Sequence, residues 1–418
     1  MDILFPYRES GIPFRIPKNA QVFHPAVLTP VDRTYTAIIK TLLRPLGYKQ
    51  TLFDIAKKCK SGCVVVDAYS SPITNRQILN PIIKTLHAAG MSHDDIIILV
   101  TSEYPSEFSQ ELFQSIFDQE FLRRYNVQAH DVFDQAQHEF IGKTSSGTPV
   151  HLDSRLQRAD LKIITGGIYP HYLFGCAGAP LLLAFGVSGP ETIQALYDLA
   201  GPENLDDFQL LNQKSKLSLE LFDMLKLAEL DFIVNISIDS AFRFVDIFSG
   251  KPASVIHEIA DRHAARGYSI LEGKADIAIS CAGNSHCEMS WYHNLMSVCL
   301  ARSFLKTGGT LIYITPLFDQ ANAQITGIRD KSDLIDFFSL NKMIHSTRAK
   351  IFSCMDEGAI VFVSPELGHA KLKKRSDRDV FFCSSVDSAL TFAAKGGTGT
   401  PNILLLPDGL FTHLGLSS

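Results

Sequence analysis

The strongest constraint on the fold is the alternation of short apolar runs with segments of helical periodicity. Residues 63–66 (CVVV), 95–100 (DIIILV) and 161–164 (LKII) are rich in β-branched residues, and polar or glycine-containing loops follow them. Such runs are typical of strands that are buried on both faces of a parallel sheet. Amphipathic helical segments lie between them, for example at residues 75–89. The pattern predicts an α/β fold with mainly parallel, Rossmann-like sheets.

A second set of strand-like runs follows a long helix predicted at residues 252–266. The runs are at residues 275–279, 310–315, 359–363, 380–383 and 402–406, and Gly308–Gly309 predicts the cap of a helix at 289–305. Before them, residues 132–150 predict a hairpin, 232–237 a strand and 248–250 a connection. Because 418 residues exceed one ordinary core, we predict two α/β domains, at 1–268 and 269–418, with a ligand cleft between them.

Composition and charge exclude several classes of partner. The net charge of −5 provides no general attraction to nucleic acid or to an anionic membrane. We find no apolar run of about 18 residues and no signal-peptide pattern, so no membrane segment is expected. Eight cysteines in 418 residues favour a reducing, cytoplasmic location. Cys59 and Cys63 are predicted to be ordinary thiols, because CKSGC has neither redox nor zinc-site spacing.

The most promising site motif is TGGIYPHYLFGCAGAP at residues 165–180. It begins at the end of a predicted strand, where α/β folds bind their ligands. Gly175 and Gly178 form a glycine-rich turn that lets backbone N–H groups approach a ligand, but the turn matches neither the dinucleotide pattern nor the P-loop. His171 titrates near neutral pH, so it is a candidate metal ligand or general base. The alternative interpretation is that His171 has a structural role and forms hydrogen bonds with the loop backbone.

Polar residues follow several other predicted strands. Asp67, Ser70 and Ser71 follow the first of them, Glu103 and Tyr104 the second, and the loop at 280–288 lies in the second domain. These exits are expected to converge on one cleft. A cluster of His286, Glu288 and His293 contains metal-ligand side chains but lacks the H-E-x-x-H pattern, so we interpret it as a polar helix start and predict no metal site.

Taken together, these stretches resemble the nickel-dependent lactate racemase family of 2-hydroxyacid racemases over nearly the whole chain. The resemblance is carried by FPYRESGIPFRIP, VVVDAYSSPITNRQIL, DIIILVTSEY, GKTSSGTPVHLDSRLQRADLKIITGGIYPHYLFGCAGAP, FIVNISID and KADIAISCAGN. The second of these is similar to the family's strand and Asp-x-Thr-Arg-Pro loop, and the fourth to its hairpin, strand and Pro-His turn. The resemblance implies a racemase that uses a nickel-pincer nucleotide.

The resemblance also marks where this chain departs from the family. The lysine that holds the cofactor through a thioamide corresponds to Leu181, and no lysine lies between Lys162 and Lys214. Of the two histidines that shuttle protons, one corresponds to His171 and the other to Tyr104. The remaining correspondences are Tyr197 for the nickel-ligating histidine, Ala68 and Ser71 for an aspartate and an arginine, and positions near His293 and Met296 for a glutamine and a lysine.

The resemblance therefore assigns His171 and Tyr104 as the catalytic candidates. The cofactor-binding candidates are Asp67, Ser70, Ser71, Gly175, Gly178, Tyr197 and His293, and Leu181 argues against covalent attachment of the cofactor.

The sequence is consistent with three different functions. One is an enzyme of altered chemistry that acts on a small molecule, such as a hydroxyacid. Another is a non-catalytic ligand-binding relative. The third is a metal-binding protein that uses His171 with Cys176, His286 or His293.

Overall fold

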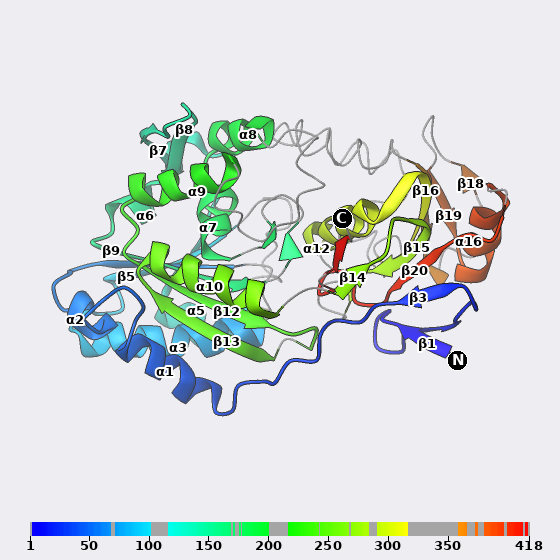
Figure 1. The fold of residues 1–418 in the computed structure, drawn as a ribbon. Helices are drawn as coiled ribbons and strands as arrows, with labels where there is room; N and C mark the ends of the chain where they lie inside the picture. Colours follow the sequence, from blue (N-terminus) through cyan, green and yellow to red (C-terminus); the bar gives the residue numbers. More distant parts are fainter. Residues whose placement is uncertain are drawn as a thin grey trace.

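The computed structural model describes residues 2–67, 72–101, 116–168, 170–171, 175–176, 178–199, 216–241, 243–266, 269–283, 291–316, 358–365, 373–374, 380–396, 399–412 and 414–416. Two main sheets lie in separate lobes, one built on six strands and one on seven (Figure 1). Most of the neighbouring strands in both sheets are parallel. The predicted α/β fold with mainly parallel sheets is confirmed.

The first sheet is formed by the strands that the apolar runs predict, with two additions. In order across the sheet they are β13 (Phe244–Gly250), β12 (Phe232–Ile238), β9 (Leu161–Ile168), β4 (Gly62–Val66), β5 (Ile96–Val100) and β6 (Asn126–Ala129). The pair β12–β13 is antiparallel and the others are parallel. Every residue of β4, β9 and β12 is buried, as expected for strands covered on both faces.

Helices cover both faces of this sheet (Figure 1). They are α1 (Thr34–Leu43), α2 (Leu52–Ala56), α3 (Pro72–Ala88), α5 (Gln119–Arg124), α6 (Ser154–Arg158), α7 (Ala179–Leu181), α8 (Pro190–Leu199), α9 (Lys216–Leu227) and α10 (Pro252–Arg266). The long helix predicted at 252–266 is confirmed. Residues 102–115, which precede α5, lie outside the described chain.

The predicted hairpin is present beside the first sheet. Its strands are β7 (His138–Lys143) and β8 (Pro149–Asp153), which pair antiparallel. The turn closes because the N–H of Thr144 donates to the carbonyl of Thr148 at 3.0 Å, and the Thr144 hydroxyl accepts the N–H of Thr148. Asp153 ends β8 and its carboxylate caps α6 by accepting the N–H of Arg155. The hairpin is thereby attached to the next helix.

The second sheet combines distant parts of the chain. Its strands, in order, are β18 (Lys373–Lys374), β19 (Val380–Cys383), β17 (Ile360–Val363), β16 (Leu305–Ile314), β15 (Ala275–Cys281), β20 (Ile403–Leu406) and β3 (Ala20–Val22). Helices α12 (Trp291–Ser303) and α16 (Val386–Ala393) pack against it. Strand β3 pairs parallel with β20, so part of the N-terminal segment lies on the second sheet, which the predicted division at residue 268 does not anticipate.

Short strand pairs complete the described chain. Near the N-terminus, β1 (Asp2–Phe5) pairs with β2 (Ile12–Arg15), and β14 (Ser269–Leu271) pairs with β21 (Leu414–Leu416) near the C-terminus. One apolar core extends through the first lobe into the second, and a smaller core packs β1 and β2 on the second sheet. No helix among the described residues has the length and apolar character needed to cross a membrane.

Two local predictions were wrong. Residues 248–250 belong to strand β13, which pairs with β12, rather than to a plain connection. Gly308 and Gly309 do not cap α12, which ends at Ser303; they lie in β16, where the pairing with β15 shifts register. In both cases the pairing with a neighbouring strand, rather than local sequence, determines the conformation.

Candidate functional site

The carboxyl ends of the parallel strands in the first sheet meet at one edge. The residues that follow β4, β5, β6 and β12 are Asp67, Thr101, His130 and Asp239, and all four are buried. Strand β10 (Pro170–His171) begins just beyond the end of β9, with one residue between them. Open α/β sheets bind ligands at this edge. The structure therefore brings the predicted exits of β4, β5 and β9 to a common edge and adds a buried histidine there.

The structure describes only some of the predicted site residues. Asp67 is buried at the end of β4, and Gly178, Tyr197 and His293 are placed below. For His171 and Gly175 the backbone is described. Ala68, Ser70, Ser71, Glu103, Tyr104, His286 and Glu288 lie outside the described residues.

His171 is held at the backbone by a short antiparallel hairpin. It pairs with Gly175 in β11 (Gly175–Cys176), and Pro170 pairs with Cys176. The Pro-His corner of the sequence motif is thus one strand of a hairpin that leaves the end of β9. The next described residue, Gly178, has φ of 141°, a conformation that favours glycine.

A short helical segment, residues 178–186, follows this hairpin, and we call it the platform. It comprises Gly178, α7 and a π-helix (Leu182–Gly186). The N–H of Ala179 donates to Oδ1 of Asn235 on β12 at 2.8 Å. A Cβ on Gly166 of β9 would lie 2.9 Å from the Ala179 nitrogen. The platform therefore rests directly on β9 and β12, and π-helical turns of this kind are frequent at functional sites.

The platform side chains are apolar and packed. Leu181 is only 4% exposed. The π-helix ends at Gly186, where an added Cβ would lie 2.7 Å from Cγ2 of Thr101. Tyr197 on α8 lies with its ring centroid 5.1 Å from that of Phe185 in the π-helix, and it packs against the main core. The position that the resemblance assigns to the cofactor lysine is thus part of an apolar cluster.

His293 lies in the second lobe. It is buried on α12, which packs against β15 and β16. Met296, near the other position that the resemblance assigns to this helix, is also buried. Neither this helix nor its neighbouring strands belong to the first sheet, so the predicted joint site requires residues from both lobes.

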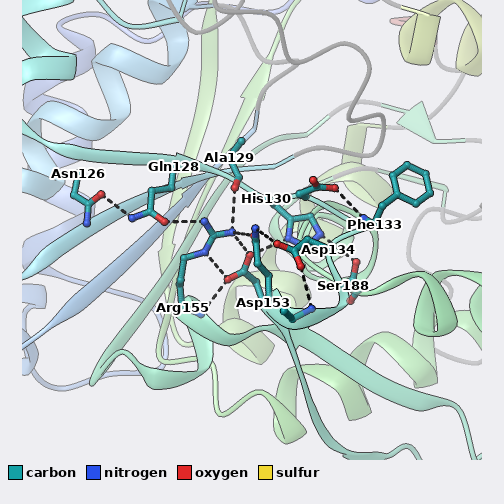
Figure 2. Close-up of polar contacts among 12 residues, drawn as sticks. Asn126, Gln128, Ala129, His130, Phe133, Asp134, Asp153, Arg155 and Ser188 are labelled. Atoms are coloured by element: carbon teal, nitrogen blue, oxygen red, sulfur yellow. Dashed lines mark hydrogen bonds and ion pairs between the residues drawn. The ribbon is translucent and has the colours of Figure 1, made fainter.

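A buried polar network was missed by the sequence analysis (Figure 2). Nδ1 of His130 lies 2.9 Å from Oδ2 of Asp153, and the side chains of both are 0% exposed. Arg155 donates through Nε to Oδ1 of Asp153 at 2.9 Å and through Nη2 to Oδ2. It also donates to the side chains of Gln128 and Gln137 and to the carbonyl of Ala129. The network joins β6, β8 and α6.

This network holds its carboxylate ionised. Burial by itself would raise the pKa of Asp153, but hydrogen bonds from Arg155 and His130 and their charges outweigh burial and hold the pKa well below its usual range. Burial lowers the pKa of the neighbouring His138, and so does the nearby His130. In the sequence, Asp153 and Arg155 are visible as a D-S-R triplet at the end of the predicted hairpin. The triplet alone did not point to the network, because strand β6, which places His130 beside it, was not predicted.

Metal-ligand side chains do not gather elsewhere in the described ranges. No group of three or more histidine, cysteine, aspartate or glutamate side chains there has an arrangement that could hold a metal ion. Cys59 and Cys63 are free thiols, and burial raises the pKa of both.

Comparison with known proteins gives consistent matches. A family model described as the lactate racemase N-terminal domain matches residues 7–202. The lactate racemase of Thermoanaerobacterium thermosaccharolyticum is 23% identical over 322 residues, which cover 74% of this chain and 73% of that protein. Residues 7–202 therefore match the N-terminal domain of lactate racemases, and the chain as a whole is similar to a lactate racemase.

Solved structures share its fold. The lactate racemase apoprotein from T. thermosaccharolyticum matches with a TM-score of 0.75 at 20% identity, covering 99% of this chain and 100% of that one. A Thermotoga maritima protein matches with a TM-score of 0.60 at 11% identity, covering 94% and 100%. Both matches cover nearly the whole chain, so the fold of both lobes is shared with these proteins.

At the positions that the resemblance assigns to the family cofactor, the residues present do not fit a covalently held group. Leu181 offers no amine for a thioamide, and it is buried in the apolar platform. Tyr197 packs on Phe185, and a neutral phenol is a poor nickel ligand compared with imidazole.

Proposed function

We propose that this chain is a lactate racemase-like protein that does not racemise lactate through a covalently held nickel-pincer nucleotide. The observation that carries the proposal is Leu181, which stands at the lysine position and is 4% exposed within α7. An aliphatic side chain cannot form the thioamide, and no lysine occurs between Lys162 and Lys214 to replace it. Its neighbours Leu182 and Leu183 are buried as well.

Proton transfer supports the same proposal. Racemisation needs a base on each face of the substrate, and the resemblance assigns these roles to His171 and Tyr104. A tyrosine has an ordinary pKa of about 10 and is a poor base at neutral pH. Because only one of these two positions holds a histidine, a competent base would lie on only one face of the substrate. Chemistry that needs a single base, or binding without chemistry, is consistent with these residues.

The ligand site that we propose is the carboxyl edge of the first sheet. The buried Asp67 and Thr101 end β4 and β5, and the β10–β11 hairpin places the backbone of His171 beyond β9. A small polar molecule, such as a hydroxyacid, is the class of ligand that the family relationship favours. The alternative is a non-catalytic ligand-binding or metal-binding relative that uses the same site.

Intact-protein mass spectrometry tests the cofactor proposal. The chain is produced together with the enzymes that make the nickel-pincer nucleotide, and a lactate racemase that has the lysine is produced in parallel. We expect a nucleotide-sized adduct on the control protein and the mass of the bare polypeptide for this chain. An adduct on this chain would overturn the proposal.

Native mass spectrometry and metal analysis of the same sample separate the alternatives. A small organic molecule retained by the folded protein, together with loss of that molecule in a His171→Ala variant, supports a ligand site at the β10–β11 hairpin. Stoichiometric nickel or zinc without such a molecule favours the metal-binding alternative.

A further inference from the structure

His130 presents both of its ring nitrogens to hydrogen-bond acceptors. Nδ1 lies 2.9 Å from Oδ2 of Asp153, and Nε2 lies 3.2 Å from the carbonyl oxygen of Ser188. The ring is completely buried, so water does not compete for either nitrogen. Figure 2 shows the ring between these two partners.

Neither partner of His130 has a proton to offer. The Asp153 carboxylate also accepts the backbone N–H and the Nε–H of Arg155 at Oδ1 and the Nη2–H at Oδ2, so it is ionised and accepts only. A backbone carbonyl such as that of Ser188 accepts only as well. A neutral imidazole carries one N–H and would leave a lone pair facing one of these oxygens. Both contacts are satisfied together only when the ring is an imidazolium.

Charged and titratable groups surround this ring on several elements. Asp153 on β8 balances its charge, while Arg155 on α6 carries a like charge and shares Oδ2 with it. His138 on β7 lies edge-to-face with the ring at a centroid distance of 5.1 Å. Its pKa is lowered by burial and by His130, which favours its neutral form. More distant are Asp134, His151 and the Cys63 thiol, whose pKa burial raises.

The contacts of His130 join the hairpin to the end of the platform. Ser188, which accepts from Nε2, donates its own hydroxyl to the carbonyl of Leu183 in the π-helix at 2.8 Å. The N–H of Asp153 donates to the carbonyl of Val187 at 2.9 Å, and the N–H of Gly189 donates to the carbonyl of His151 at 2.9 Å. The hairpin thus holds the segment that leads from the platform into α8, the helix that carries Tyr197.

We propose that His130 is a positioning residue, a buried imidazolium that fastens hairpin β7–β8 to the exit of the platform and so sets where α7 and α8 stand at the site. The inference rests on the proposed function only in taking the platform as part of the ligand site. A charge-assisted hydrogen bond at each end is stronger and more directional than a neutral one, which suits a clamp of this kind.

Nitrogen-15 NMR of the wild-type protein labelled at histidine tests the protonation state directly. The spectrum is recorded on the folded protein in neutral buffer. We expect the His130 ring to show two protonated nitrogens, and its signal is assigned by its absence from a His130→Phe sample. A ring with one protonated nitrogen would overturn the inference, and this result needs no variant to fold.

Amide hydrogen exchange tests the clamp. In His130→Phe we expect the amides of Asp153 and Gly189 to exchange about tenfold faster or more than in the wild type, because two buried hydrogen bonds are lost. The matched control is His87→Phe, which removes a partly buried histidine near the end of α3 whose Nδ1 lies 2.8 Å from the carbonyl of Met91. Equal exchange at these two amides in both variants would refute the positioning role.

These readouts need neither cofactor nor ligand. A nucleotide adduct would therefore refute the proposed function and leave the His130 inference intact. A singly protonated His130 would refute the His130 inference and leave the proposed function intact.

Discussion

The backbone N–H of Ala179 donates to Oδ1 of Asn235 at 2.8 Å, and this bond fixes the first residue of α7 on strand β12. Asn235 is 1% exposed, so the bond is shielded from solvent. It lies opposite Gly166 in the pairing of β12 with β9. The start of the platform is thus anchored where two central strands of the first sheet meet.

Asn235→Ala should destabilise the protein by about 1 to 3 kcal/mol, because a buried backbone N–H loses its acceptor. Urea denaturation measures the change. The control is Asn126→Ala, since the amide of Asn126 pairs with Gln128 at the exposed end of the sheet. Equal unfolding midpoints for the two variants would mean that the anchor contributes nothing.

Gly166→Ala should also destabilise the protein, by roughly 1 to 3 kcal/mol. The new Cβ would lie 2.9 Å from the nitrogen of Ala179 and 3.0 Å from the carbonyl carbon of Gly178, and both are backbone atoms that cannot rotate away. Gly62→Ala on β4 is the matched control, because its nearest neighbour is the sulfur of Met91 at 3.4 Å. Thermal unfolding of the two variants distinguishes a close approach of the platform from a general cost of alanine in this sheet.

Asp153 should make the free energy of unfolding depend on pH in the acid range. Its pKa is lower in the folded state than in the unfolded chain, where aspartate titrates near about 3.9, so the folded protein binds fewer protons. The stabilisation is fully present above about pH 4 and is lost as the pH falls toward the folded-state pKa.

Asp153→Asn should therefore lower stability at neutral pH by about 3 to 5 kcal/mol, because it leaves the partly buried Arg155 guanidinium without its anion and the His130 ring without its carboxylate partner. Between about pH 4 and pH 2, its free energy of unfolding should fall less steeply than that of the wild type, by up to about 1.4 kcal/mol per pH unit. Urea titrations at each pH measure both. Asp118→Asn, at an exposed helix cap, is the control, and a parallel pH dependence for wild type and Asp153→Asn would contradict the prediction.

Leu181→Lys tests whether the platform is an apolar cluster. A lysine at a position that is 4% exposed must bury its amine among aliphatic side chains or displace them, so we expect a loss of about 2 kcal/mol or more relative to Leu181→Met. Methionine conserves volume and should cost less than about 1.5 kcal/mol. If lysine and methionine unfold at the same temperature, the position has room and polar partners for an amine.

Local sequence was sufficient for elements with a clear apolar pattern, either the helical spacing of an amphipathic helix or the continuous run of a buried strand. The helix at 252–266 and the strand at 380–383 were predicted with the bounds that the structure has. Local sequence was not sufficient where pairing with a neighbouring strand determines the conformation. Strand β13 was missed because residues 244–250 include Asp246 and Ser249, and they become a strand by pairing with β12. Residues 126–129 (NVQA) likewise show no apolar run and form β6 at the edge of the sheet.

The sequence by itself determined the α/β class, the position of the glycine-rich motif and the absence of any lysine between Lys162 and Lys214. Each is a property of residue type and local spacing, which hydrophobic periodicity and backbone preferences express directly. Only the tertiary structure decided that β3 joins the second sheet and that His130, Asp153 and Ser188 meet beside the platform. Such contacts join residues that are far apart in the chain, and their partners are selected by packing and by the need to satisfy buried polar groups.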